Sequence, residues 1–494
     1  MKIIPYSSLL KVSAFAIIPS LQMKEESFMK NQLAIVCGTL LATTYLPAAE
    51  LRVTTFENPW QDQTKTIKTS TCDSAATVKL ALDKTDQIII GFGPCMSELS
   101  HEALWRLSAA KRAKVMDEIF SPEGGGFTVI RTPIGASDFA KGFYSYCETP
   151  DDFEMKTFST DHDDATLIPL IHEVQKRVPA NLLKIWGTPW CPPRWMKTNR
   201  NAVSRPDKVN DLTEEGRIFE GEDGFVCDDA HMKAYALYFR KYFESYRAKG
   251  IPLWMVMPQN EFNSAQNFPS CTWSVGQLTK FIGCYLGPML AGSGVELYFG
   301  TMERPYPYML DAVLARPAYA KYVTGAAFQW DGKSALPHVR AKYPHLTYVM
   351  SEQECGNGDN SWKHALHCWD LMLHYLTNGV SVYNYWNLAL QKDGVSHWGW
   401  KQNSLVVVDA ATDSAAFMPE YYMLKHLSHF VHRGAKRLVT EGSHLDALAF
   451  VNTDQSIIVM MANKEATPKS ISITLKEKTY SVTLPASSVA TLKF

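Results

Sequence analysis

Two glutamates, Glu261 and Glu352, stand where a pair of carboxyl groups could do acid–base and nucleophilic chemistry. Each follows a short apolar segment, Leu253–Met257 or Leu346–Met350, of the kind that forms a buried parallel strand. The strands of a parallel barrel deliver the residues that follow them to one rim. Two carboxyls at such a rim can cleave a glycosidic bond, because one protonates the leaving oxygen while the other attacks the anomeric carbon.

The spacing of the two glutamates leaves other interpretations open. Most glutamates lie on protein surfaces, so both could be solvated residues at the start of loops. Glu354 lies two residues beyond Glu352, on the same face of an extended strand, and could take its place. We favour Glu352 because of the residues around it, which are considered below.

The composition indicates a large globular chain. With 494 residues, 46% of them hydrophobic, it is long enough for a barrel and an appended module. The net charge of −1 argues against a nucleic-acid partner, which would need a basic face. Thirteen Trp and 22 Tyr offer flat amphipathic surfaces that suit sugar rings, which favours a neutral substrate.

A secretory signal is expected near the N-terminus. Met29-Lys30-Asn31 precedes the apolar run Leu33–Tyr45 and the small residues Ala48-Ala49, and this order is typical of such signals. The apolar run is too short for a stable membrane span. We therefore expect export to the periplasm or the extracellular space after cleavage. Residues 1–28 would then be an upstream extension before the true start, and an N-terminal anchor is the alternative.

Strands and helices alternate through most of the chain. Helical apolar stripes separate most of the predicted strands, and eight such alternations over roughly 300 residues are typical of a (β/α)8 TIM barrel. An open doubly wound sheet is the alternative, but no dinucleotide-binding fingerprint follows Gly91. The eight predicted strands are Gln87–Gly91, Phe127–Arg131, Leu183–Trp186, Leu253–Met257, Val295–Phe299, Gly325–Gln329, Leu346–Met350 and Val380–Tyr385.

Both ends of the chain differ from this pattern. Beyond about Ala435, alternating strands follow one another without helices, which predicts a small antiparallel β module. Leu51–Phe56 and Ala76–Leu82 have the same character and could join it. We therefore expect a signal and extension in residues 1–49, N-terminal strands of the module in 50–85, the barrel in 86–433 and the rest of the module in 434–494.

The residues that follow the predicted strands could bind several hydroxyl groups. A sugar site needs polar groups that bind hydroxyls beside an aromatic wall. The predicted rim supplies both, with a guanidinium, carboxylates, an amide and indoles. These candidates are Arg131 and Asp138 after strand two, Trp190 after strand three, Asn260 and Glu261 after strand four, Trp330 after strand six, Glu352 after strand seven and Trp386 after strand eight.

The chain resembles glycoside hydrolase family 30, and specifically its glucosylceramidase branch. The resemblance runs from about Gly91 to the C-terminus, and it implies an α/β fold in which a (β/α)8 barrel carries an antiparallel β-sandwich built from both chain ends. The motifs that carry it are Tyr144-Ser145-Tyr146 through Pro150-Asp151-Asp152-Phe153, Trp190-Cys191-Pro192-Pro193-Arg194-Trp195-Met196-Lys197-Thr198-Asn199, Asn260-Glu261, Ser351-Glu352 and Tyr385-Trp386-Asn387-Leu388-Ala389-Leu390.

The resemblance implies a role for each matching residue. Glu261 would be the general acid/base and Glu352, which follows the Ser that the family places there, the nucleophile of a retaining enzyme. Asn260 would bind the 2-hydroxyl and Arg131 would keep the nucleophile ionised. Asp138 and Trp190 would bind distal hydroxyls, and Trp386 would form part of the pocket floor. Trp330 lies where the chain departs from the family pattern, so it is a candidate for substrate binding from its rim position alone.

We therefore expect a retaining β-glycosidase that acts on β-glucosides, either a glucosylceramide-like glycolipid or a glycan. Within the family, an endo-β-1,6-glucanase, a xylosidase or a fucosidase is the alternative, because Phe328-Gln329-Trp330-Asp331 departs from the His-Trp-Tyr of the glucosylceramidase pattern. A non-catalytic carbohydrate-binding protein is the alternative of another class. It would lack one of the two glutamates, and both are present.

No cofactor or metal is expected. His426, His429 and His432 recur at three-residue spacing and could hold a metal on one helix face, but we favour a solvated helix, because no carboxylate nearby completes a site. The ten cysteines are scattered without CxxC spacing, which argues against a zinc site and against a disulfide framework.

Overall fold

A computed structural model describes residues 49–71 and 75–494 of the chain. The expected upstream extension and signal segment lie outside the described residues, apart from Ala49 at their boundary. Eight parallel strands form a closed barrel in the order β10-β11-β12-β5-β6-β7-β8-β9. They are β5 (Gly91–Cys95), β6 (Val129–Pro133), β7 (Lys184–Thr188), β8 (Met255–Val256), β9 (Glu296–Met302), β10 (Val323–Gln329), β11 (Thr347–Gln353) and β12 (Val380–Asn387).

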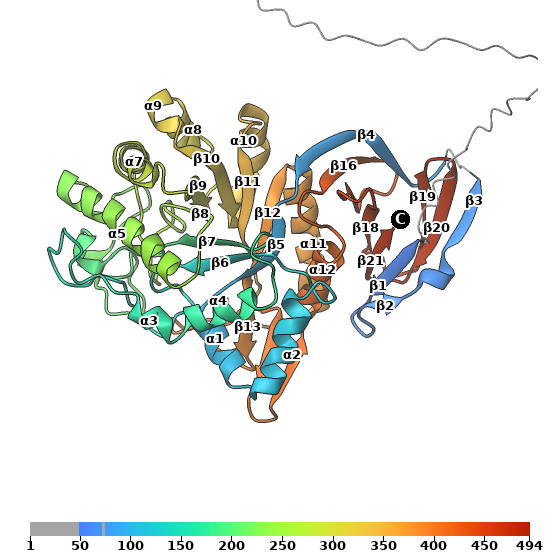
Figure 1. The fold of residues 1–494 in the computed structure, drawn as a ribbon, viewed down its shortest axis with the longest axis horizontal. Helices are drawn as coiled ribbons and strands as arrows, with labels where there is room; N and C mark the ends of the chain where they lie inside the picture. Colours follow the sequence, from blue (N-terminus) through green and yellow to red (C-terminus); the bar gives the residue numbers. More distant parts are fainter. Residues whose placement is uncertain (1–48, 72–74) are drawn as a thin grey trace, which may run out of the picture. The chain divides into compact units, whose positions relative to one another are not determined.

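Helices connect the barrel strands and surround them (Figure 1). Their buried faces carry the apolar stripes seen in the sequence. The helices are α1 (Glu98–Trp105), α2 (Ala109–Phe120), α3 (Asp161–Asp164), α4 (Leu167–Gln175), α5 (Asp229–Ala248), α6 (Val275–Phe281), α7 (Gly287–Leu290), α8 (Tyr308–Leu314), α9 (Pro317–Ala320), α10 (Leu336–Lys342), α11 (Trp362–Thr377) and α12 (Pro419–Ser428).

Side chains from seven strands and from the residue after β8 fill the inside of the barrel. Val129, Trp186, Met255, Met257, Tyr298, Ala327, Val349 and Val382 form one buried cluster there. The barrel is therefore a packed core and not a channel, and its chemistry is confined to the loops at one end.

A ten-stranded sheet brings the two ends of the described chain together. Its order is β2-β1-β21-β18-β17-β16-β4-β19-β20-β3, so the first strand lies against the last (Figure 1). Both halves of this order contribute to one apolar cluster, so they face each other as the two layers of a sandwich. The strands are β1 (Glu50–Thr54), β2 (Gln61–Asp62), β3 (Lys68–Thr71), β4 (Val78–Ile88), β16 (Lys436–Glu441), β17 (Ala447–Val451), β18 (Ile457–Asn463), β19 (Lys469–Leu475), β20 (Lys478–Leu484) and β21 (Ser488–Lys493).

These observations confirm the predicted fold class, a (β/α)8 barrel with an antiparallel β-sandwich built from both chain ends. A small sheet of β13 (Ala389–Gln391), β14 (Val406–Asp409) and β15 (Ser414–Phe417) was not predicted. It extends the connection that follows β12.

The first barrel strand was predicted four residues too early. Gln87 and Ile88 belong to β4 of the sandwich, and the Gln87 amide donates to the backbone oxygens of Leu376 and Val380. The barrel strand β5 begins only at Gly91. The sequence of β5, Gly-Phe-Gly-Pro-Cys, does not predict a strand, because glycine and proline are uncommon in strands.

Gly93 is required in β5 because the neighbouring strand passes very close to it. A Cβ at Gly93 would lie 1.9 Å from the backbone oxygen of Val129. Gly93→Ala should therefore destabilise the protein by about 3 kcal/mol or more. At Gly142 a Cβ would meet nothing within 4 Å, so Gly142→Ala should change stability by no more than about 0.5 kcal/mol. Urea unfolding compares the two variants, and equal midpoints would contradict this account of the packing.

Candidate active site

The eight candidate residues lie together at the C-terminal rim of the barrel. Hydrogen bonds and ring contacts join all of them, directly or through Gln329 at the end of β10. They are Arg131 in β6, Asp138 after β6, Trp190 after β7, Asn260 and Glu261 after β8, Trp330 after β10, Glu352 in β11 and Trp386 in β12.

Arg131 is the fully buried cation of the site. Its Nη1 donates to Glu352 Oε2 at 2.8 Å and to the backbone oxygen of Ser351 at 3.2 Å. Its guanidinium carbon lies 4.3 Å from the ring centre of Trp190 and 5.6 Å from that of Trp386. The indoles exclude water from the ion pair, so the geometry of Glu352 is held by a charge-assisted hydrogen bond in a dry environment.

The Gln329 amide lies between the two carboxylates. Its Nε2 is 3.0 Å from Glu261 Oε1 and 3.3 Å from Glu352 Oε2, so these two oxygens are no more than about 6.3 Å apart, the sum of the two distances. Ser351 Oγ donates to Gln329 Oε1 at 2.8 Å and fixes which way the amide points. Carboxyl groups about 5–5.5 Å apart are typical of retaining glycosidases, and inverting enzymes need roughly 6.5–9.5 Å.

Asn260 is oriented by three donors to a single atom. Its Oδ1 accepts from Arg131 Nη2 at 2.6 Å, from Thr301 Oγ1 at 3.2 Å and from Gln329 Nε2 at 3.3 Å. The amide oxygen is therefore engaged. Its Nδ2 group has no partner among the described residues and can donate to another molecule.

The two glutamates have different electrostatic environments. Burial, and then the charge of Glu352, raises the pKa of Glu261 well above that of an ordinary glutamate. Burial also raises the pKa of Glu352, but Arg131, Trp330 and Gln329 oppose that effect by stabilising its anion. Burial and the neighbouring charge therefore favour the protonated form of Glu261, whereas Arg131 favours the anion of Glu352.

Several polar atoms at the site have no partner in the described part of the chain. They are Asp138 Oδ1, Trp386 Nε1 and Arg131 Nε, all of them buried. Trp190 and Trp386 stack with their ring centres 5.2 Å apart and form a flat wall beside these atoms. Unpartnered buried polar groups are costly, so a ligand whose hydroxyls bonded to these atoms would offset that cost.

Glu261 and Trp330 both have left-handed backbone conformations, with φ of 49° and 46°. Such values are uncommon for large side chains and persist where the surroundings impose them. The Glu261 amide donates to Thr301 Oγ1 at 3.0 Å, and Lys333 Nζ donates to the Trp330 backbone oxygen at 3.0 Å. The indole of Trp330 donates to Glu352 Oε1 at 3.3 Å.

Comparison with known families gives the site its context. The model of the "Glycosyl hydrolase family 30 TIM-barrel domain" matches residues 89–431, and that of the "Glycosyl hydrolase family 30 beta sandwich domain" matches residues 434–492. The chain belongs to glycosyl hydrolase family 30. The resemblance inferred from the sequence motifs is thereby confirmed, and the protein is a glycoside hydrolase whose substrate is a carbohydrate or a glycolipid.

Two kinds of name occur among the curated relatives of the chain. The mouse "Lysosomal acid glucosylceramidase" is 28% identical over 411 residues, which cover 78% of this chain and 76% of the relative. The "Endo-1,6-beta-D-glucanase" of Neurospora crassa is 27% identical over 428 residues, which cover 80% of this chain and 84% of the relative. Membership of the family therefore establishes that the protein is a glycosidase. The names of these relatives differ in substrate, so they do not identify the substrate of this protein.

Solved structures of low sequence identity share the fold. SrfJ from Salmonella typhimurium superposes with a TM-score of 0.81 at 23% identity and covers 90% of this chain and 99% of its own. The structure of the endo-beta1,6-glucanase BT3312 superposes with a TM-score of 0.76 at 22% identity, and the match covers 90% of this chain and 99% of that structure's chain.

Glu354, the rival of Glu352 in the sequence, faces a different environment. It pairs with Lys333 at 2.9 Å and with His367 at 3.0 Å. Burial opposes its ionisation, but these contacts outweigh burial and hold its pKa at about 2. Strand β11 ends at Gln353, so the alternation that would place Glu352 and Glu354 on one face no longer applies.

Of the three histidines at three-residue spacing, only His426 lies within α12; His429 directly follows the helix, and His432, which is exposed, lies beyond it. His426 is fully buried, and its two ring nitrogens contact the hydroxyls of Thr491 at 3.0 Å and Thr54 at 2.8 Å. The expectation of a solvated helix was wrong at His426, because α12 packs against the sandwich strand β21. Within residues 49–71 and 75–494, no group of three or more His, Cys, Asp or Glu could hold a metal ion.

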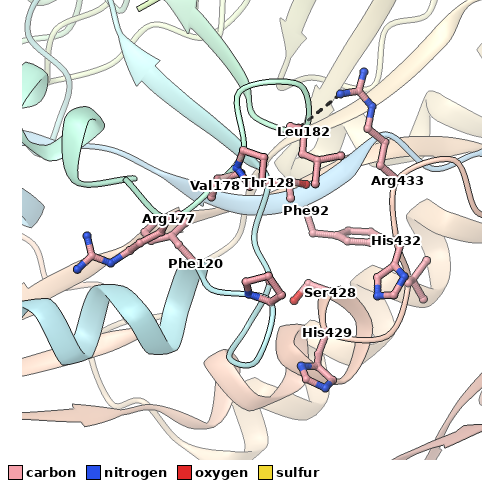
Figure 2. Close-up of a pocket in the computed structure, with 14 residues that line it drawn as sticks. Phe92, Phe120, Thr128, Arg177, Val178, Leu182, Ser428, His429, His432 and Arg433 are labelled. Atoms are coloured by element: carbon pink, nitrogen blue, oxygen red, sulfur yellow. Dashed lines mark hydrogen bonds between the residues drawn. The ribbon is translucent and has the colours of Figure 1, made fainter. Parts of the chain in front are cut away.

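A hollow of about 160 Å³ lies at the opposite end of the barrel (Figure 2). Thr128, which lines it, directly precedes β6, and Leu182 lies two residues before β7. Arg433 donates to the backbone oxygen of Leu182 at its edge. No carboxylate lines this hollow, and barrel enzymes place their chemistry at the other end, so we assign it no part in the reaction.

Sequence reasoning missed several residues of the site, above all Gln329, Thr301 and Gln266. Gln329 was placed at the end of predicted strand six, and a polar residue at that position was the only signal for it. Thr301 and Gln266 carry no such signal. Among the described residues, no helix is long and apolar enough to cross a membrane, and the eight described cysteines are free thiols.

Proposed function

We propose that the protein is a retaining β-glycosidase that hydrolyses β-glucosides by double displacement. Glu352 is the nucleophile and Glu261 is the acid/base. The observation that carries this proposal is the single amide of Gln329, which bridges both carboxylates and limits their separation to about 6.3 Å.

The two steps use the groups in turn. Glu352 attacks the anomeric carbon, and Glu261 gives its proton to the departing oxygen, which leaves as an alcohol. Glu261, now an anion, takes a proton from water as that water attacks the same carbon and releases Glu352. Arg131 keeps Glu352 ionised and aimed, because its hydrogen bond favours the carboxylate form.

The remaining residues hold the sugar. Asn260 donates to the 2-hydroxyl from its free Nδ2, next to the reacting carbon. Asp138 and Trp190 bind distal hydroxyls, Trp386 forms the floor of the pocket, and Trp330 lines it beside Glu352. The unpartnered atoms of Asp138 and Trp386 support these assignments, since hydroxyl groups would satisfy them.

A covalent label tests the nucleophile directly. A 2-deoxy-2-fluoro β-glucoside with a good leaving group should trap one sugar on the enzyme, and peptide mass mapping should place it on Glu352. A label on Glu354 would overturn the assignment. A protein that binds sugars but hydrolyses none of a broad panel of β-glycosides would instead be a non-catalytic carbohydrate-binding protein.

Activity should decline as the pH rises through the raised pKa of Glu261, because the acid step needs its proton. The charge of Glu303 contributes to the raised pKa of Glu261, so Glu303→Gln should lower that pKa and move the high-pH limb of kcat/KM to lower pH. Glu296 is the first residue of β9, whereas Glu303 directly follows its last, so Glu296→Gln should leave the limb in place. Profiles of kcat/KM against pH compare the three proteins, and an unmoved or upward-shifted limb in Glu303→Gln would contradict this electrostatic account.

An endo-β-1,6-glucanase is the second candidate function. The relatives from Neurospora crassa and Aspergillus fumigatus that carry this name support it. A xylosidase or fucosidase of the same family is a further variant. Product analysis on β-1,6-glucan, glucosylceramide and aryl β-glycosides separates these possibilities, because endo action releases oligosaccharides and exo action releases single sugars.

We also propose that the protein is exported, on the strength of the basic, apolar and small-residue order in residues 29–49. N-terminal sequencing of the mature protein tests this. A mature chain that still begins at or before Met29 would contradict cleavage.

A further inference from the structure

The loop that follows β9 lies beside the acid/base. Strand β9 stands between β8, which leads to Glu261, and β10, which ends at Gln329. Residues 303–307 therefore reach the same rim. Asn263, two residues after Glu261, contacts Met309 Sδ at 3.5 Å, which holds the start of α8 against this part of the site.

A chain of polar contacts links Glu261 to Arg304 in this loop. Gln266 Nε2 donates to Glu261 Oε2 at 3.3 Å and to Ser264 Oγ at 2.6 Å. Arg304 Nη2 donates to the same Ser264 hydroxyl at 3.3 Å. Arg304 also pairs with Glu303, whose charge contributes to the raised pKa of Glu261.

Arg304 ties this loop to the long segment between β7 and α5. Its Nη2 and Nε contact the two carboxylate oxygens of Glu220 at 2.5 Å and 3.2 Å, a two-point pairing that restricts both partners. Phe219 precedes Glu220 in the chain, so it is held next to the β9–α8 loop.

Three exposed aromatic rings lie in or beside the two segments that this ion pair joins. Phe219 is 59% exposed, Tyr306 44% and Tyr308 55%, and the two tyrosine ring centres lie 5.9 Å apart. The part of the chain that the structure describes has one other strongly exposed large aromatic side chain, Phe56. Three of four exposed rings thus gather at one place, and we call Phe219, Tyr306 and Tyr308 the aromatic rim.

We propose that the aromatic rim binds a second sugar ring on the leaving-group side of the cleaved bond, so that the natural substrate is a glycan. The inference rests on the proposed function, because Glu261 protonates the leaving oxygen and whatever that oxygen carries must lie on the Glu261 side. The β9–α8 loop is linked to Glu261 through Gln266, Ser264 and Arg304, so exposed rings carried by this part of the rim are placed to meet the leaving group.

The chemistry of the aromatic rim fits a sugar better than an acyl chain. Sugar rings present C–H faces that stack on aromatic planes, and their hydroxyls can bond to the tyrosine hydroxyls and to the charged groups between the rings. An acyl chain over the same surface would remove water from Glu220 and Arg304 without replacing its hydrogen bonds.

Two substrates separate binding at the aromatic rim from catalysis. β-Glucosyl fluoride has a one-atom leaving group that cannot reach the rim. A β-linked glucose disaccharide, chosen as the best substrate among the linkage isomers, places a second ring there. The variants are Tyr306→Ala, Tyr308→Ala, Phe219→Ala and the Tyr306→Ala/Tyr308→Ala pair, with Phe56→Ala as the control for loss of an exposed ring.

The double variant should lose about tenfold in kcat/KM on the disaccharide and less than about twofold on the fluoride. Tyr306→Phe, which keeps the ring, should retain most of the activity of the wild-type protein, and Phe56→Ala should match it on both substrates. Equal losses on both substrates, or no loss on the disaccharide, would overturn the inference.

If the double variant loses more kcat/KM on a detergent-dispersed glucosyl lipid than on the disaccharide, the inference is overturned, and the rim binds an acyl chain instead. A wild-type protein that leaves β-glucosyl fluoride intact would overturn the proposed function, and the inference with it. If the protein hydrolyses the fluoride and the rim variants retain full activity on the disaccharide, the role of the aromatic rim is rejected and the proposed function stands.

Discussion

Glu352→Gln should lower kcat by roughly four to six orders of magnitude, the scale seen when a covalent nucleophile is removed. The amide that replaces the carboxylate is neutral and cannot form the glycosyl ester. It can still accept from Arg131 and Trp330, so the fold should survive. Steady-state kinetics on an aryl β-glucoside measures the loss, with circular dichroism to verify folding.

Glu354→Gln is the matched control for this variant. Glu354 is the same residue type two positions away, but its carboxylate pairs with Lys333 and His367 and, in the described part of the chain, forms no hydrogen bond or ion pair with Glu261 or Arg131. We expect kcat within about tenfold of the wild-type value, since only a peripheral ion pair is lost. The assignment fails if the Glu354 variant is the inactive one.

Glu261→Gln should lower the rate by about 10²–10⁴-fold on substrates with sugar or alkyl leaving groups, the usual contribution of a general acid. The size of the loss should depend on the leaving group. A 2,4-dinitrophenolate departs without protonation, so the first step should be nearly unaffected on that glucoside. The second step should then be slow, because no base activates water, and the glycosyl-enzyme should accumulate.

A pre-steady-state burst of dinitrophenol followed by slow turnover checks this behaviour. The same variant should also lose the high-pH limb of its profile, because that limb reports the proton of Glu261. An identical loss for every leaving group, with no burst, would show that Glu261 is not the proton donor.

The site could be anticipated because parallel strands deliver the residues after them to one rim. Arg131, Asn260, Glu261, Glu352 and Trp386 are far apart in sequence, yet each stands at or just after a strand of β character. The spacing of apolar residues and the ends of the strands can be seen in the sequence itself. The positions of these residues therefore follow from the local sequence pattern and the topology of the barrel.

Other features depend on contacts that no local pattern encodes. Gln329 bridges the carboxylates only because the rotamer of its amide is set by Ser351 on the next strand. Strand β5 was misplaced because Gly91 and Gly93 serve close approach between strands, which outweighs their low strand propensity. His426 was expected in solvent because the partners that bury it, Thr54 and Thr491, lie near opposite ends of the chain.

The anomeric form of the first-released sugar tests the central claim most directly. Proton NMR can follow the hydrolysis of an aryl β-glucoside before mutarotation equalises the anomers. Two carboxylates bridged by one amide predict that the β-anomer appears first, with the α-anomer growing only later. Initial release of the α-anomer would mean a single displacement by water, and would contradict the covalent role of Glu352.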